Sequence, residues 1–302
     1  MTKNEHYSVM LKETILSLNI KPNGTYVDLT MGMGGHSIAI LKRLNNEGKL
    51  ICFDKDKFAI SITNEKLKVI NSNYILIHSD FSNLKNELKK HNINSVDGII
   101  ADLGMSSPQI DNPERGFSYS QDAYLDMRMN QDETLDAYKV VNSYSEQQLN
   151  EILYSYADVK LAKQVAKAIV KNRPIKTTFE LVKIVKEAYP AALLREKNPA
   201  KAIFQAIRIE VNHEYDSIKS MLEQSIELLK PNSSLSIITF HSGEDKIVKN
   251  FFGNLIKSKI PNKMPIIEEK KYLTKSIYPS NEEIEINNRS RTAKLRILTK
   301  LK

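Results

Sequence analysis

The chain has 302 residues, of which 41% are hydrophobic, and its 44 Lys and Arg exceed its 36 Asp and Glu by a formal charge of +8. This composition excludes an intrinsically disordered chain, and the length suits one large domain or two ordinary ones. The positive charge favours a polyanionic partner such as nucleic acid, although a basic globular protein without such a partner has the same balance.

The sequence contains one cysteine, Cys52, inside an apolar run. A single cysteine excludes an intrachain disulfide and a cysteine-based zinc site, and we expect Cys52 to be a small buried side chain. The N-terminus lacks the pattern of a secretory signal, and no apolar run reaches the roughly 18 residues that cross a bilayer. We therefore expect a cytoplasmic protein with no membrane partner.

Strand and helix patterns alternate in the first third of the chain. We expect strands at 25–29, 49–53, 74–78 and 96–102, and helices at 37–44 and 56–66. Strands separated by helices of this length indicate a parallel sheet. From about 134 to 194 the pattern is helical, and helix returns from 202 to 229.

The strand pattern then resumes near the C-terminus. We expect a strand at 234–240, an edge or antiparallel strand at 293–298, and a long surface loop from Lys257 to Asn288. The simplest fold is α/β: a Rossmann-like sheet built from residues 1–106 and 206–302, interrupted by an all-helical insertion at 107–205.

A glycine-rich segment, Asp28-Leu-Thr-Met-Gly32-Met-Gly34-Gly35-His36, follows the first predicted strand. Glycines allow a ligand to approach bare backbone, but position 37 is Ser where a dinucleotide fingerprint has a third glycine. An ordinary tight turn therefore remains an alternative. Asp54 ends the second strand, where an acid can accept both ribose hydroxyls of NAD or of S-adenosylmethionine. Phe81 follows the third strand and either packs on an adenine face or belongs to the core.

The fourth strand ends in Asp102-Leu-Gly-Met-Ser-Ser-Pro-Gln109, a polar segment where a transferred group would meet its acceptor. An aryl amine is a poor nucleophile because its lone pair is delocalised into the ring. A carboxylate or carbonyl that bonds the amine hydrogens can orient the nitrogen for attack. Amine-directed nucleic-acid methyltransferases place an acid or amide followed by prolines here, and this segment is similar in logic. Such chemistry requires no metal.

Several segments resemble one family, the 16S ribosomal RNA cytosine-N4 methyltransferases known as small-subunit methyltransferase H or MraW. They run in family order along nearly the whole chain. The segments are His6-Tyr-Ser-Val-Met-Leu-Lys-Glu13, Tyr26-Val-Asp-Leu-Thr-Met-Gly-Met-Gly-Gly-His-Ser37, Asp102-Leu-Gly-Met-Ser-Ser-Pro-Gln-Ile-Asp111, Arg115-Gly-Phe-Ser118, Leu125-Asp-Met-Arg-Met129, Phe204-Gln-Ala-Ile-Arg208, Phe240-His-Ser242 with Glu244-Asp245, and Asn288-Arg-Ser-Arg291.

The resemblance implies a Rossmann-like methyltransferase sheet with a helical insert after the fourth strand. It implies S-adenosyl-L-methionine as the cofactor and N4-methylation of a cytidine in the decoding region of 16S rRNA, within the small ribosomal subunit. The implied cofactor contacts are Gly34, Gly35, His36, Asp54, Phe81, Asp102 and Gln109. From the residues themselves we expect Asp102, Ser107 and His241 to be catalytic. Whether the chain forms a homodimer stays open.

Three segments depart from the family pattern. Lys201 and Ala202 stand where the family has Thr-Arg, Tyr156-Ala-Asp158 replaces Gly-Glu-Glu, and Gly243 replaces a leucine. None of these changes touches the implied cofactor residues.

The candidate RNA contacts are Arg115, Arg128, Arg208 and Ser242. Arg128 could equally pair with Asp126 as a structural clamp. His241 and Ser242 either form a base pocket or hold RNA, or else Ser242 caps the following helix. A run of basic residues from Arg289 to Lys302 contains no acid and suits an RNA backbone, although such runs are often solvated faces.

Three other functions remain in view. Amine methylation of DNA needs the same active-site chemistry. A non-catalytic ribosome-assembly factor would have a damaged cofactor or acceptor loop, which the sequence does not show. A nicotinamide-dependent oxidoreductase is disfavoured by Ser37 and by the lack of an evident acid–base pair at a hydride site.

Overall fold

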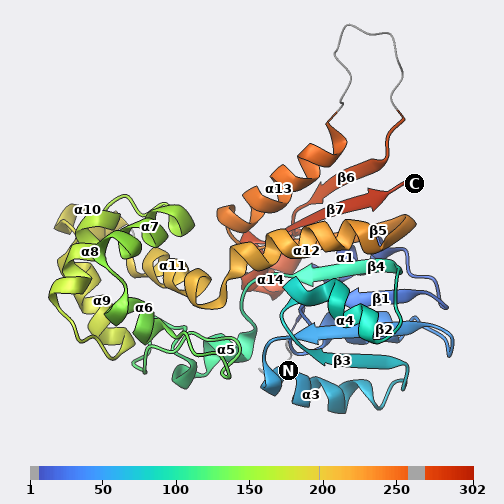
Figure 1. Cartoon of the computed structure of the whole chain (residues 1–302), viewed down its shortest axis with the longest axis horizontal. Helices are drawn as coiled ribbons and strands as arrows, with labels where there is room; N and C mark the ends of the chain where they lie inside the picture. The colour runs from blue at the N-terminus through green and yellow to red at the C-terminus, as the bar shows by residue number, and fades with distance from the viewer. Residues whose placement is uncertain (1–6, 197, 258–268) are drawn as a thin grey trace, which may run out of the picture. The chain divides into compact units, whose positions relative to one another are not determined.

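The computed structural model describes residues 7–196, 198–257 and 269–302, and the chain forms two compact units (Figure 1). The first unit is Met1–Gly104 with Tyr215–Lys302, and the second is Met105–Glu214. The boundary expected between 205 and 206 falls inside helix α11 (Ala200–Asn212). Phe204 and Ile207 on either side of that point both lie in the core of the second unit, so the whole helix belongs to it.

Within the described residues, the first unit contains a seven-stranded sheet in the order β3-β2-β1-β4-β5-β7-β6. The strands are β1 (Thr25–Asp28), β2 (Lys49–Asp54), β3 (Tyr74–His78), β4 (Val96–Asp102), β5 (Leu229–Thr239), β6 (Tyr272–Ile277) and β7 (Lys294–Lys300). The first five strands are parallel, and β7 runs antiparallel between β5 and β6. Chain order reverses between β1 and β4, and open sheets bind ligands at the carboxyl ends of such a pair. The Rossmann-like α/β class is confirmed.

Side-chain alternation along the strands divides the core between the two faces of the sheet. Val27 and Ile51 pack with helices α4, α12 and α13, whereas Tyr26, Leu50 and Cys52 pack with α1, α2 and α3. Figure 1 shows α12 and α4 crossing the nearer face of the sheet. The bounds are α1 (Leu11–Leu18), α2 (Gly35–Leu41), α3 (Lys57–Leu67), α4 (Leu84–Lys90), α12 (Glu214–Leu228) and α13 (Ser242–Ile256). Cys52 is fully buried, as expected.

The C-terminal region differs from its sequence prediction. The stretch from 257 to 288 is not one long loop, because it contains β6 and helix α14 (Asn281–Ile286), which Ser280 caps. Residues 258–268 lie outside the described part of the chain. β7 is antiparallel, as one of the two expectations had it, but β6 and not β7 is the edge strand. The helix expected at 202–229 is two helices, because His213 takes a left-handed conformation with φ 52°.

The second unit is helical, as its sequence pattern predicts. Its helices are α5 (Ser107–Asp111), α6 (Ala137–Ser143), α7 (Glu146–Ala157), α8 (Ala162–Lys171), α9 (Thr178–Glu187), α10 (Ala191–Glu196) and α11. Buried residues recur at helical spacing, as with Leu149 and Leu153 on α7 and Val165 and Ile169 on α8. In neither unit does a described helix have the length and apolar character that crossing a membrane requires.

Candidate active site

The glycine loop after β1 approaches its neighbours so closely that side chains do not fit. Gly34 has φ +85°, and a Cβ built there would lie 2.6 Å from Cγ2 of Thr63. A Cβ on Gly35 would lie 1.8 Å from Oγ of Ser8. Gly32 is held at both ends of its peptide: its carbonyl accepts from Thr63 Oγ1 at 2.8 Å, and its N–H donates to Asp54. The loop is therefore a fixed backbone surface at the switch point.

Ser37, which breaks the dinucleotide pattern, has a structural partner in this loop. Its buried hydroxyl donates to Asp28 Oδ2 at 2.6 Å, and Asp28 Oδ1 accepts from the Thr30 N–H at 3.1 Å. Burial raises the pKa of Asp28 to about 6, although both hydrogen bonds oppose the shift. A glycine at position 37 would leave this buried carboxyl with one partner fewer.

Asp54 lies at the carboxyl end of β2, and its carboxylate holds the backbone around it. Oδ2 accepts from the Gly32 N–H at 2.7 Å, and Oδ1 accepts from the Asp56 N–H at 2.8 Å. Burial raises the pKa of Asp54 to about 6 against these bonds. Because each carboxylate oxygen accepts more than one hydrogen bond, Asp54 keeps the capacity to accept ribose hydroxyls.

His36 and Asp102 meet where β1 and β4 end. The His36 ring is buried, with Nε2 3.2 Å from the Val9 carbonyl and Nδ1 3.9 Å from Asp102 Oδ2. The backbone N–H of Asp102 donates to Thr30 Oγ1 at 2.6 Å. Asp102 Oδ1 is buried and has no hydrogen-bond partner among the described residues. A buried acceptor without a partner is costly in a folded protein and marks a place where a ligand can donate.

The Asp102 carboxyl has a raised pKa. Burial is the first cause that raises its pKa well above the usual value, and the negative charges of Asp28, Glu244 and Glu283 add to it. The side chain as a whole keeps 24% exposure, which comes from atoms other than Oδ1. The group is thus a stronger base, when ionised, than an ordinary carboxylate.

Phe81 and the segment after Asp102 are placed as follows. Phe81 begins the short helix η1 (Phe81–Asn83), is partly buried and packs against the core beneath α12, so the core alternative holds for part of its ring.

Gln109 is buried, and its Oε1 accepts from the Ser106 N–H at 3.0 Å in the cap of α5, which begins at Ser107. Ser107 and Gln109 belong to the second unit. Their approach to a ligand at Asp102 stays a prediction.

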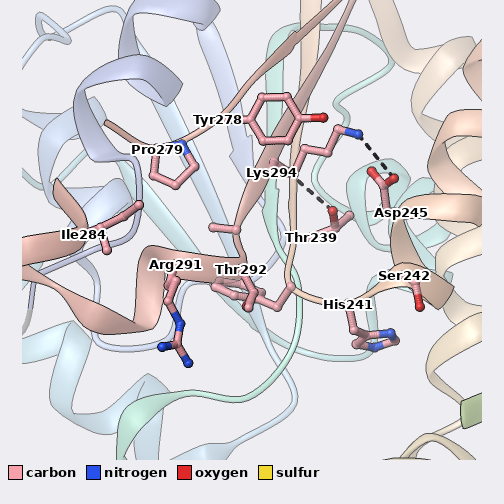
Figure 2. Close-up of a pocket in the computed structure, with 12 residues that line it drawn as sticks. Thr239, His241, Ser242, Asp245, Tyr278, Pro279, Ile284, Arg291, Thr292 and Lys294 are labelled. Carbon is pink, nitrogen blue, oxygen red and sulfur yellow. Dashed lines mark hydrogen bonds and ion pairs between the residues drawn. The ribbon is translucent and has the colours of Figure 1, made fainter. Parts of the chain in front are cut away.

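Helix α13 begins differently from the expectation. Its N-cap is His241 and not Ser242, because Glu244 Oε2 accepts from the Phe240 N–H at 2.8 Å and from the His241 N–H at 3.4 Å. Glu244 Oε1 also lies 2.9 Å from His241 Nε2. Ser242 is exposed beside the histidine (Figure 2). Ser242 is therefore not the N-cap of this helix, which was one of the two roles expected for it.

Gly243, which replaces the leucine of the family pattern, has a steric reason in this chain. A Cβ at this position would lie 1.8 Å from the hydroxyl of Tyr215. The tyrosine therefore occupies the space that a larger residue at 243 would need.

The three candidate RNA-binding arginines are engaged inside the second unit. Buried Arg115 donates to two backbone carbonyl oxygens at 2.9 and 3.0 Å. Arg128 makes a bidentate pair with Asp126 at 2.6 and 3.1 Å, which is the clamp foreseen as its alternative. Arg208 makes a buried bidentate pair with Glu214 at 2.7 and 2.8 Å. RNA contact by these arginines stays a prediction.

Glu283 is a residue of this edge that sequence reasoning missed. Its Oε1 accepts from the Met10 N–H at 2.5 Å and from Ser290 Oγ at 2.7 Å, and it thereby ties the N-terminal segment to α14. The residue lies in the stretch that was expected to be a loop. The local signals for α14 in the sequence are the N-cap Ser280 and the acidic residues Glu282 and Glu283 in the first turn.

Comparisons with known proteins identify the family of this chain. A model of the MraW methylase family matches residues 3–301. The chain is 65% identical over 299 residues to Ribosomal RNA small subunit methyltransferase H of Mycoplasmopsis agalactiae, with 99% of each chain covered. It is 55% identical over 300 residues to the protein of the same name from Mycoplasmopsis synoviae, again with 99% of each covered. The chain belongs to the MraW methylase family and is a methyltransferase enzyme.

Proposed function

We propose that this protein transfers a methyl group from S-adenosyl-L-methionine to N4 of a cytidine in the decoding region of 16S rRNA. The family and the names of the relatives support small-subunit rRNA as the substrate. The observation that carries the choice of an amine acceptor is the buried, unpartnered Oδ1 of Asp102 at the carboxyl end of β4. It can accept a hydrogen bond from an exocyclic amine.

The first unit has the features that S-adenosylmethionine requires. Gly34 and Gly35 leave bare backbone where a Cβ would clash, and Asp54 can accept the ribose hydroxyls. Phe81 supplies the exposed part of its ring to an adenine face. Two buried acids, Asp28 and Asp102, add negative charge that complements a sulfonium. When bound, the cofactor supplies a methyl group on a positively charged sulfur. Its thioether is then a strongly activated leaving group.

Asp102 has two tasks in the reaction. In its ionised form, Oδ1 accepts one N4–H of the target cytosine and turns the nitrogen lone pair toward the methyl carbon. After transfer, N4 carries one proton too many, and Asp102 accepts it. The raised pKa of this carboxyl makes that acceptance more favourable than it is for an ordinary aspartate. The target base must leave its stack to reach this position.

The other candidate site residues have proposed roles in the same reaction. His36 is buried between the Val9 carbonyl and Asp102, and so fixes the position of the carboxyl. We assign Ser107 and Gln109, which follow Asp102 in the chain, to the target amine and the cofactor. His241 and Ser242 contribute to the base pocket. The expected partner is the small ribosomal subunit, which places the protein in the cytoplasm, and homodimer formation stays untested.

The test is transfer of labelled methyl from S-adenosylmethionine to small ribosomal subunits that lack the modification, to naked 16S rRNA and to duplex DNA. Digestion and nucleoside mass spectrometry then identify the product. N4-methylated cytidine from subunits or rRNA is the expected result. Methylated DNA alone supports the DNA alternative, and cofactor binding without transfer to any nucleic acid supports the assembly-factor alternative. Either outcome refutes the proposal.

A further inference from the structure

A pocket of about 420 Å³ opens within the first unit beside the end of β5. Its wall is formed by Thr239 to Ser242 with Asp245, by Tyr278, Pro279 and Ile284, and by the residues from Arg291 to Lys294 (Figure 2). This volume falls in the range of roughly 300–1,000 Å³ that small-molecule sites occupy. The pocket is large enough for part of a nucleotide.

The pocket combines an aromatic face with positive charge. Tyr278 is 66% exposed, and Lys294 Nζ lies 5.1 Å from the centre of its ring. Lys294 also pairs with Asp245 at 3.4 Å, and Arg296 donates to the same carboxylate at 2.5 and 3.0 Å. Asp245 is thus shared by two cations, and its own pKa is lowered because these charges outweigh the effect of burial.

Arg291 is the uncommitted cation of this pocket. It is exposed, and its side chain has no hydrogen bond or ion pair with any residue that the structure describes. Figure 2 shows its guanidinium extended away from the pair formed by Lys294 and Asp245. Asp245, the acid of the pocket, already pairs with Lys294 and Arg296. The charge of Arg291 is therefore available to an anion that enters the pocket. An exposed aromatic ring and an arginine without a described partner, both lining one pocket, are a combination that can bind single-stranded RNA through base stacking and phosphate contact.

The pocket lies at the sheet edge that holds Asp102. Asp102 pairs with Ile238 on β5, and Thr239 pairs with Lys294 on β7. The pocket therefore starts one to two strands from the proposed acceptor, or about 5–10 Å away at the usual spacing of strands. Phe240 lines the pocket and also lies near Gly104, two residues after Asp102, where a Cβ would be 3.5 Å from its ring. A base at Asp102 and a neighbouring nucleotide in the pocket can thus belong to one RNA strand.

We propose that this pocket binds a nucleotide that flanks the target cytidine, with its base stacked on Tyr278 and its phosphate held by Arg291. The proposal rests on the proposed function, since the target cytidine must bind at Asp102. It assigns these two residues to substrate binding, and it gives them no part in cofactor binding or in methyl transfer itself.

The test compares Arg291→Gln and Tyr278→Ala with Arg43→Gln, a matched change of an exposed arginine after α2, near the amino ends of the strands. Methyl transfer to unmodified small subunits is measured at several salt concentrations. We expect the KM of each pocket variant to rise about fivefold or more, from the usual strength of a charged hydrogen bond or a stacked base. The kcat and the S-adenosylmethionine affinity should stay within about twofold, and Arg291→Gln should flatten the salt dependence by roughly one phosphate contact.

A wild-type KM in both variants, or an equal loss in Arg43→Gln, overturns the proposal. A loss of cofactor affinity together with a lowered unfolding temperature also overturns it, because a structural role then explains the result. A second measurement separates this proposal from the proposed function. A short single-stranded RNA with 4-thiouridine next to cytidine is photocrosslinked to the wild-type protein, and crosslinks at Tyr278 support the pocket even if no methyl transfer occurs. Crosslinks confined to other segments contradict it.

Discussion

Replacing Asp28 with asparagine removes a buried negative charge while keeping the shape of the side chain. Asp28 is 1% exposed, and it accepts hydrogen bonds from the Ser37 hydroxyl and the Thr30 N–H. In Asp28→Asn the amide oxygen can still accept from Thr30, and the amide nitrogen can donate to the Ser37 oxygen. The substitution therefore tests the charge with little change in hydrogen bonding.

The magnitude follows from the pKa of Asp28. Its pKa is raised from 3.8 to about 6 by burial. Between these values the folded protein binds more protons than the unfolded chain, so the free energy of unfolding falls as the pH rises through this window. A difference of about 2 pH units corresponds to roughly 3 kcal/mol, which is the upper limit of the destabilisation at about pH 7. Well below the unfolded pKa of 3.8, at about pH 3 or lower, the carboxyl is largely neutral in both states and this contribution vanishes.

The assay is urea unfolding of the cofactor-free wild type and of Asp28→Asn, from about pH 4 to about pH 8. We expect a difference of less than about 1 kcal/mol at the acid end and a more stable variant, by about 1–3 kcal/mol, at neutral pH. Asp216→Asn is the control, because the Asp216 side chain is 79% exposed and an exposed ion pair contributes little to stability. An Asp28→Asn variant that is less stable than wild type by the same amount at every pH would refute the reasoning.

Three further outcomes are expected. Gly35→Ala should weaken S-adenosylmethionine binding, measured by calorimetry, by about tenfold or more, because its Cβ would lie 1.8 Å from Ser8 Oγ. The double variant Gly35→Ala with Ser8→Gly should recover much of the lost affinity. If affinity does not recover, this clash is not the cause. Arg208→Ala should lower the free energy of unfolding by about 3–5 kcal/mol, because it leaves Glu214 buried without its bidentate partner. The double variant Arg208→Met with Glu214→Leu should restore stability. Unchanged stability in Arg208→Ala would instead favour the RNA-contact role. The affinity for S-adenosylmethionine should fall as the pH drops below about 6, where Asp54 becomes protonated and loses acceptor capacity, and Asp54→Asn should abolish that dependence; an unchanged profile in the variant would remove Asp54 from the cause.

Sequence patterns predicted the sheet well because the buried strands carry their own signal. Apolar runs such as 49–53 must be strands between helices, and the parallel order follows from the length of the crossovers. β6 was missed because its burial is slight along most of its length, so it has no apolar run to mark it. The same holds for α14, which has no buried residue among those described.

The parts of the site that depend on specific side-chain partners could not be predicted from the sequence. Asp102 and Asp54 could be placed because the ends of parallel strands share one edge. Ser37 seemed a defect of the glycine pattern until its bond to Asp28 was visible, since a partner nine residues away along a turn leaves no periodic signal. The sequence likewise does not reveal that the Arg115 guanidinium donates hydrogen bonds to two backbone carbonyls.

The central claim is that Asp102 orients the target amine and accepts its proton. Its most direct test is single-turnover methyl transfer to unmodified small subunits by wild type, Asp102→Asn and Asp102→Ala, with cofactor affinity and unfolding measured on the same samples. Asp97→Asn is the matched control, because Asp97 lies at the other end of β4 and pairs with Lys230. We predict a loss of about 100-fold or more in the rate with Asp102→Ala, and an intermediate rate with Asp102→Asn, whose amide oxygen can accept a hydrogen bond but cannot take a proton. Folded Asp102 variants that bind cofactor and transfer methyl at the wild-type rate would contradict the account.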